Sequence, residues 1–259
     1  MRGAAMRIFL ASFVNGLNEE RRRICLEKGK PKYLLESFFY RKHCEDTIKL
    51  VEKDNFLLDC GAFSFMSGKE ISKEKMELFV IDYIKFINLH DIQHFIEVDV
   101  DSIYGLDQVE KWRELIEKET GKKTIPVWHR WRGIEYWKDM VRNYKYVAMG
   151  SQVQKVFNIS QQDYDNIKKM VFYAYTKGVK VHGLGFTKTR ELPDYKYFSV
   201  DSSSWNTTAF LGNNIQIFNG QHMIQRKIKT TNKVDHKKLG QHNFIEWCKY
   251  QKYMDRGIV

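Results

Sequence analysis

The chain has 259 residues, with 43 Lys or Arg against 32 Asp or Glu, and its formal net charge is therefore +11. A 43% apolar share over this length is enough to bury a full core, which excludes global disorder, and no run of 18 apolar residues could form a membrane-spanning helix. Residues 56–120 carry 14 acidic and 7 basic groups, so the positive excess lies mostly after residue 120. This distribution favours a polyanionic partner such as nucleic acid, and a basic soluble surface is the simpler alternative.

Short apolar runs of strand length alternate with segments of helical period along the chain. Eight runs are expected to form strands: residues 6–13, 56–63, 94–100, 124–129, 146–151, 180–186, 197–205 and 215–224. Helices are expected over residues 31–53, 72–90, 105–120, 134–143, 160–177 and 235–255. Ser72 and Ser160 are expected as N-caps, and Gly121 and Gly178 as the residues that end the helices before them.

Eight strands separated by helices in about 250 residues are typical of a closed (β/α)8 TIM barrel. We therefore predict a single TIM-barrel domain over residues 1–259. An open doubly wound sheet is the alternative, but the first strand is not followed by the GxGxxG turn of that fold and there is no Walker sequence. In a barrel, the residues that carry chemistry are expected at the carboxyl ends of the strands.

Polar side chains stand where the apolar runs end, and they are Asp59, Asp99, Asp101, His129, His182 and Asp201. A carboxylate at the end of a buried strand is costly unless it is paired or has a task, so this set predicts a site at the mouth of the barrel. Each Asp could instead cap a turn, and His182 could be a hydrogen-bonded core histidine. Trp128, Trp131 and Trp205 are expected to pack, with stacking on a ligand as the alternative. The basic runs at 21–23 and 227–238 are either solvated surface or phosphate contacts.

The four cysteines are scattered, with no CxxC pair, and no HExxH or similar ligand spacing is present. This pattern predicts thiols in a reducing compartment and gives no indication of a metal site or another cofactor. The N-terminal apolar run is short and has no cleavage site after it, so we expect no signal peptide and a cytoplasmic location.

The strand ends resemble those of the tRNA-guanine transglycosylase superfamily, and most closely the small DNA-acting 7-deazaguanine transglycosylases of phages and bacteria (DpdA type). The family's DSGGFQ-like sequence corresponds to residues 59–64, and its base-binding Asp to Asp99-Val100-Asp101. Its Gly-x-Gly strand corresponds to residues 183–185, and the strand that presents its nucleophile to residues 199–202. Ala62 and Ser64 depart from the pattern, and the His129 region replaces a Gln that reads the base. The family's Cys3His zinc subdomain has no counterpart, which favours DNA over tRNA as the substrate.

The resemblance implies that guanine in a nucleic acid is exchanged for a 7-deazaguanine base through a covalent enzyme–sugar intermediate. Asp201 would be the nucleophile and Asp59 the general acid and base. The implied substrate-binding residues are Asp99, Asp101, Phe63, His129, Gly150, Ser151, His182 and Gly183. No cofactor and no metal would be required, and the protein would act in the cytoplasm of a bacterial cell, encoded by the host or by a phage.

Two other functions are compatible with the same residues. A barrel hydrolase or lyase could act on a small molecule through a divalent metal bound by Asp99 and Asp101. A barrel without catalytic activity could bind nucleic acid through its basic surface.

Overall fold

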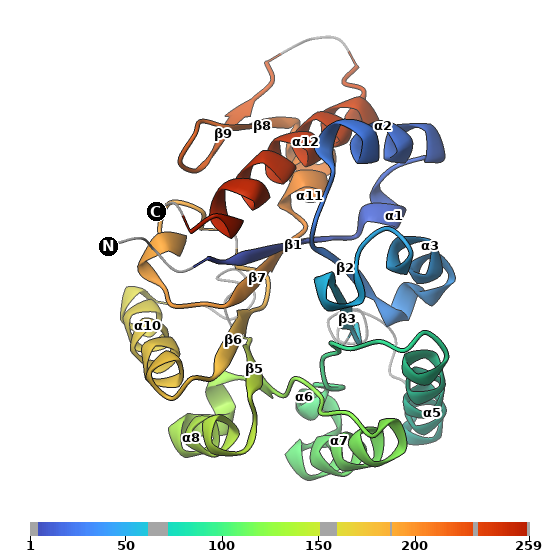
Figure 1. The fold of residues 1–259 in the computed structure, drawn as a ribbon, viewed down its shortest axis with the longest axis vertical. Helices are drawn as coiled ribbons and strands as arrows, with labels where there is room; N and C mark the ends of the chain where they lie inside the picture. The colour runs from blue at the N-terminus through green and yellow to red at the C-terminus, as the bar shows by residue number, and fades with distance from the viewer. Residues whose placement is uncertain (1–4, 62–71, 151–159, 187, 230–232, 258–259) are drawn as a thin grey trace.

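Seven strands form one parallel sheet in the computed structural model, which describes residues 5–61, 72–150, 160–186, 188–229 and 233–257. The strand order is β3-β2-β1-β7-β6-β5-β4. The strands are β1 (Arg7–Ala11), β2 (Leu34–Ser37), β3 (Phe56–Asp59), β4 (Val127–Trp128), β5 (Tyr146–Met149), β6 (Lys180–Gly183) and β7 (Ser199–Ser202). The sheet is strongly curled (Figure 1). Phe95 and Ile96 bridge from its edge strand β3 to Ile125, just before the other edge strand β4, so the two edges lie near each other.

The prediction of a closed eight-stranded (β/α)8 barrel is wrong. The third predicted strand, residues 94–100, makes only single parallel bridges: Phe95 pairs with Leu58 of β3, and Ile96 pairs with Ile125 just before β4. The eighth predicted strand, residues 215–224, belongs to a separate antiparallel hairpin of β8 (Asn214–Phe218) and β9 (Met223–Lys227). The fold is thus an α/β fold with a curled seven-stranded parallel sheet.

Helices lie around the outside of the curled sheet (Figure 1). The α-helices are α1 (Phe13–Gly16), α2 (Glu19–Gly29), α3 (Cys44–Ile48), α5 (Lys73–Leu89), α6 (Asp101–Tyr104), α7 (Leu106–Thr120), α8 (Gly133–Asn143), α10 (Gln161–Thr176), α11 (Ser204–Gly212) and α12 (His236–Asp255). Short 3-10 turns are η1 (Phe38–His43), η2 (Lys53–Asn55), η3 (Arg130–Arg132) and η4 (Leu192–Asp194). In the described part of the chain, no helix is long and apolar enough to cross a membrane.

Most helices expected from the sequence are confirmed, with their caps. Ser72 accepts the backbone N–H of Lys75 at the start of α5, and Ser160 forms a capping box with Asp163 at the start of α10. Gly121 ends α7 with φ +66°, a conformation that glycine adopts at little cost.

The helix predicted over residues 31–53 is wrong. It begins as strand β2, continues as η1 and ends as the short helix α3. Leu34, Leu35 and Glu36 are all buried, because β2 lies between β1 and β3 with neighbours on both sides. A strand inside a parallel sheet buries consecutive residues, so the run of large residues lacks the alternation that marks a half-exposed strand.

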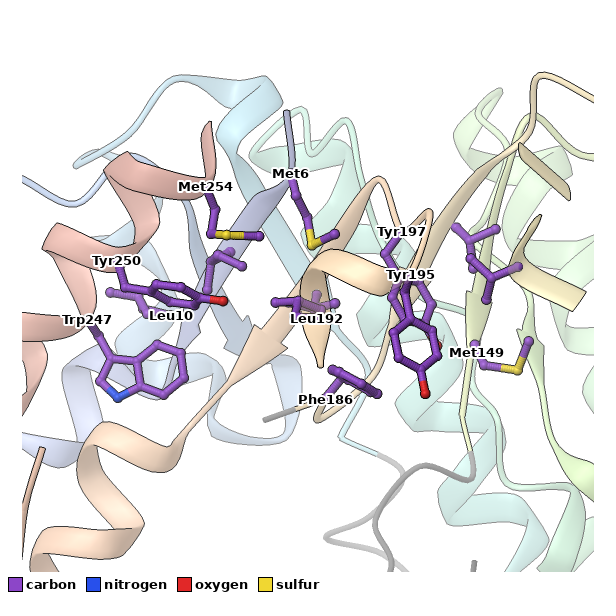
Figure 2. Close-up of a cluster of buried hydrophobic side chains, with 14 of the residues drawn as sticks. Met6, Leu10, Met149, Phe186, Leu192, Tyr195, Tyr197, Trp247, Tyr250 and Met254 are labelled. Carbon is purple, nitrogen blue, oxygen red and sulfur yellow. The ribbon is translucent and has the colours of Figure 1, made fainter. Parts of the chain in front are cut away.

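Apolar side chains gather in three clusters. The largest packs α12 and α10 against one part of the sheet, and Figure 2 shows Trp247, Tyr250 and Met254 of α12 reaching toward Leu10 of β1. A second cluster packs α5 and α7 against β3. The third lines the inner side of the curl, with residues such as Phe9, Leu57 and Ala148. All four cysteines are buried: Cys25 and Cys248 in the first cluster, and Cys44 and Cys60 in the second.

Helix α12 joins the hairpin to the sheet. The Asn243 side-chain oxygen accepts the N–H of Gln216 at 2.8 Å, and Glu246 accepts the N–H of Phe218 at 2.9 Å. Near the other end of α12, the buried Gln251 amide accepts the N–H of Lys32 at 2.6 Å and donates to the carbonyls of Ile8 and Tyr33 at 2.6 and 2.9 Å.

Replacing Gln251 with Ala should therefore lower the free energy of unfolding by about 2–4 kcal/mol, because three backbone groups lose a buried partner. The matched control is Gln162→Ala on the exposed face of α10, which should change it by less than about 0.5 kcal/mol. Urea denaturation of both variants measures the difference. Equal free energies of unfolding for Gln251→Ala and Gln162→Ala would show that Gln251 does not fix α12 to the sheet.

Candidate active site

Three carboxyl groups meet at the carboxyl ends of the strands. Asp59 is the last residue of β3, Asp201 lies near the end of β7, and Asp99 follows the bridging pair Phe95–Ile96. Asp99 and Asp201 are both close enough to Asp59 for their charges to act on it. The sequence prediction that these three residues share one site is consistent with this geometry. We call Asp59, Asp99 and Asp201 the carboxylate cluster.

Asp59 has an unusually high pKa for a carboxyl group. Burial, together with the negative charges of Asp99 and Asp201, raises the pKa of Asp59 to about 8. The N–H of Gly61 donates to its Oδ2 at 3.1 Å and opposes part of this effect. Asp59 as a whole residue is intermediate between buried and exposed. A carboxyl group that holds its proton at pH 7 beside other carboxylates is suited to act as a general acid.

Asp201 is held by two groups from β6 and the residues after it. The N–H of Gly185 donates to Asp201 Oδ1 at 2.7 Å, and His182 Nε2 lies 3.2 Å from the same oxygen. These contacts fix the orientation of the carboxylate.

The contacts continue inward as a chain of hydrogen bonds. His182 Nδ1 lies 2.7 Å from Ser199 Oγ, and Ser199 Oγ lies 2.6 Å from the Tyr146 hydroxyl. An ionised Asp201 can only accept, so a neutral His182 carries its hydrogen on Nε2 and accepts at Nδ1. Ser199 then donates to His182 and accepts from Tyr146, and every group in the chain is satisfied.

Asp99 is held from the other side by the residues that follow β3 and β4. His129 Nε2 lies 3.0 Å from Asp99 Oδ2, and the Cys60 thiol lies 3.4 Å from Oδ1. The His129 ring packs directly on Gly150, where an added Cβ would lie 2.5 Å from Cε1 of the ring. Gly150 therefore has to be glycine for His129 to reach Asp99.

Asp101 belongs to a buried ion network beside the carboxylate cluster. Arg132 donates to Asp101 Oδ2 at 2.9 Å and to Glu97 at 2.7 Å, and Arg113 donates to Glu97 at 3.0 Å. Burial alone would raise the pKa of Asp101, but the hydrogen bond and charge of Arg132 lower it below its ordinary value. Glu97, Asp99 and Asp101 are alternate residues of one segment, but Asp99 contacts His129 whereas Glu97 and Asp101 contact Arg132.

The remaining predicted residues have different positions. Phe63 and Ser151 lie outside the described residues. His182 is fully buried behind Asp201 and forms a hydrogen bond with it. Its surroundings are therefore those of a hydrogen-bonded core histidine, the alternative that the sequence left open. Gly183 is packed against Tyr197 and Val200, each 3.1 Å from an added Cβ, so its lack of a side chain serves packing.

Sequence reasoning missed Ser199 and Tyr146. Ser199 stands two residues before Asp201 on β7, so the period of two along a strand could have placed it on the same face as Asp201. Tyr146 is on β5, and no local signal connects it to β7. Within the described residues, no group of three or more His, Cys, Asp or Glu is arranged to hold a metal ion.

The sequence was compared with models of protein families and with curated proteins. No family model matches it, and no curated protein shows a significant match. The assignment of the site therefore rests on the chain's own residues.

The raised pKa of Asp59 predicts how stability depends on pH. In the unfolded chain Asp59 ionises near pH 4, whereas in the folded protein it does so near pH 8. Between these values the unfolded state has released a proton that the folded state keeps, so the contribution of Asp59 to stability is lost as pH rises through this window. An asparagine side chain cannot ionise, so Asp59→Asn should stabilise the protein at pH 8.5 by about 4 kcal/mol relative to its effect at pH 5, since the pKa difference acts over nearly three pH units.

Denaturant unfolding of the wild type and of Asp59→Asn at both pH values measures this difference. Glu36, whose pKa burial raises to about 7, is present in both proteins and cancels in the comparison. The control is Asp139→Asn, an exposed carboxyl on α8, which should show no such pH dependence. An Asp59→Asn effect that is the same at pH 5 and pH 8.5 would contradict the crowding of the carboxylate cluster.

Proposed function

We propose that the protein is a base-exchanging transglycosylase, which replaces guanine in a nucleic acid by a free 7-deazaguanine base. The observation that carries this proposal is the contrast between two carboxyl groups in one cluster. Asp59 holds a proton near neutral pH, and Asp201 is oriented by the N–H of Gly185 and by His182. Cleavage of a glycosidic bond with retention uses such a pair, one member as acid and the other as nucleophile.

In the first half of the proposed reaction, Asp201 attacks C1′ of the sugar while the bond from C1′ to the base nitrogen breaks. Asp59 gives its proton to the leaving base, which departs neutral, and the sugar is joined to Asp201 as an ester. In the second half, the ring nitrogen of the incoming base attacks C1′ and releases Asp201. The proton of that ring nitrogen passes to Asp59, so the enzyme ends in its starting state.

Asp99 supports the recognition of the base. Guanine and 7-deazaguanine present an N–H and an exocyclic amine on one edge, and a carboxylate is an acceptor that matches two such donors. Asp99 is fixed from behind by His129 and Cys60, which leaves its remaining lone pairs for a ligand. A target within a duplex has to leave the stack before it can reach this position.

The proposed partner is nucleic acid, with DNA favoured over tRNA. Exposed cations follow one another on β9 and along the chain into α12: Arg226, Lys227, Lys229, Lys233, Lys237 and Lys238. The hairpin that carries the first of them is joined to the chain after β6, because Thr189 accepts the N–H of Met223 at 3.2 Å. Action on cellular nucleic acid corresponds to the cytoplasmic location expected from the sequence.

Incubation of the protein with DNA or tRNA and a radiolabelled 7-deazaguanine base tests the activity. Label should enter the polymer, and Asp201→Asn or Asp59→Asn should reduce the rate by at least about a thousandfold, because each removes a group that acts directly on the reacting bond. Asp139→Asn should retain the wild-type rate. Lack of incorporation into both polymers, although the protein binds them, would exclude the proposal.

The salt dependence of binding tests the basic surface. Changing Arg226, Lys227 and Lys229 together to Gln should lower the slope of log K against log salt concentration by about 2–3, because each phosphate contact contributes about 0.7–0.9. The matched control is the same charge change on α5, at Lys73, Lys75 and Lys85, which should leave the slope unchanged. Equal slopes for the two triple variants would show that β9 does not contact the backbone of the nucleic acid.

A further inference from the structure

Trp131 is exposed over half of its surface, at 51%, although it lies beside the buried residues of the candidate site. The other tryptophans of the chain are buried: Trp112, Trp128, Trp137, Trp205 and Trp247. Trp131 is part of η3, which directly follows β4 at the carboxyl end of the sheet. A single exposed aromatic ring is ordinary on a protein surface, and Trp131 differs in its place at the carboxyl end of the sheet, beside the carboxylate cluster.

Contacts with two neighbouring side chains hold the indole ring in place. It stacks on the imidazole of His129, with ring centroids 4.5 Å apart and planes inclined by 6°. Its Nε1–H donates to Asp101 Oδ2 at 2.7 Å. Asp101 is fixed in turn by Arg132, and His129 by Asp99, so neither support can turn away.

This arrangement presents a flat aromatic surface next to Asp99. An aromatic ring that is already immobilised loses little conformational entropy when a planar ligand stacks on it. Bases of single-stranded nucleic acid stack on such rings without regard to sequence, because every base has a π-face.

We propose that Trp131 is a stacking platform for a nucleobase of the polynucleotide substrate, adjacent to the carboxylate cluster. The inference rests on the proposed function in that it takes the substrate to be a nucleic acid. It goes further, since it assigns a binding role to a residue for which the sequence favours packing. His129 then holds two groups in place, the carboxylate of Asp99 and the ring of Trp131.

The test uses the full-length protein and two single-stranded DNA oligonucleotides of equal length, one with bases and one made of abasic sites. Trp131→Leu should weaken binding of the first by about tenfold, the scale of one lost base stack. It should leave binding of the abasic strand unchanged, because that strand carries the same phosphates. Trp131→Phe, which keeps a smaller ring, should lose less affinity than Trp131→Leu.

The control is Phe172→Leu on α10, since Phe172 is an aromatic residue of similar exposure, 53%, on another element. It should bind both strands as the wild type does. Thermal unfolding of each variant establishes that it is folded. In the wild type, the strand with bases should also protect tryptophan emission from quenching by iodide, and in Trp131→Leu this protection should vanish.

Equal affinity of wild type and folded Trp131→Leu for the strand with bases would overturn the inference. An equal loss of affinity for both strands would overturn it as well, because the effect would then not depend on stacking. Failure of the proposed function is distinguishable: the binding difference at Trp131 would persist while no labelled base enters any polymer. An inactive protein with Trp131-dependent binding would be a nucleic-acid-binding protein.

Discussion

Glu97 carries its charge at a point where its side chain has no contact with solvent, and much of the structure is organised around that charge. An unpaired carboxylate in such a place would cost several kcal/mol. Arg113 from α7 and Arg132 from η3 neutralise it, and the N–H of Val127 in β4 donates to it at 2.8 Å. Glu97 itself follows the pair Phe95–Ile96, which bridges the two edge strands. One buried charge thus joins β4, α7, η3 and the bridging segment, and holds the edges of the curled sheet near each other.

The curl determines the chemistry of the site. Asp59 belongs to the edge strand β3, and His129 follows the opposite edge strand β4, yet both act around Asp99. In a flat sheet with this strand order they would be the most distant residues of the set. Arg113 and Arg132 are already occupied by Glu97 and Asp101, whereas Asp99 and Asp201 are each paired with a histidine. Burial and the negative charge that remains together raise the pKa of Asp59, which lowers the stability of the folded protein at alkaline pH.

The local sequence was sufficient to predict helix ends and the polar residues at strand ends, because both depend on neighbouring residues. Ser72, Ser160 and Gly121 mark helix ends because capping depends on neighbouring residues, and Asp59, Asp99 and Asp201 were identified because parallel strands present their carboxyl ends together. The number of strands and the closure of the sheet depend on pairing between distant segments. Residues 31–53 contain strand β2, but no local pattern in this segment indicates that it pairs with β1 and β3. The same limit applies to the site: Trp131 and Tyr146 acquire their contacts from Asp101 and Ser199, which are 30 and 53 positions away.

The distribution of the cysteines makes the two main apolar clusters separately observable. Cys25 lies in α2 and Cys248 in α12, whereas Cys44 begins α3 and Cys60 directly follows β3. Burial raises the pKa of the Cys25 thiol to about 12 and raises that of Cys44 as well, so neither reacts readily while its surroundings stay closed. A thiol reagent therefore modifies each pair at the frequency with which its own half of the molecule opens. Partial labelling followed by mass spectrometry can then show whether the half with α12 or the half that carries Asp59 unfolds first, without the introduction of any foreign probe.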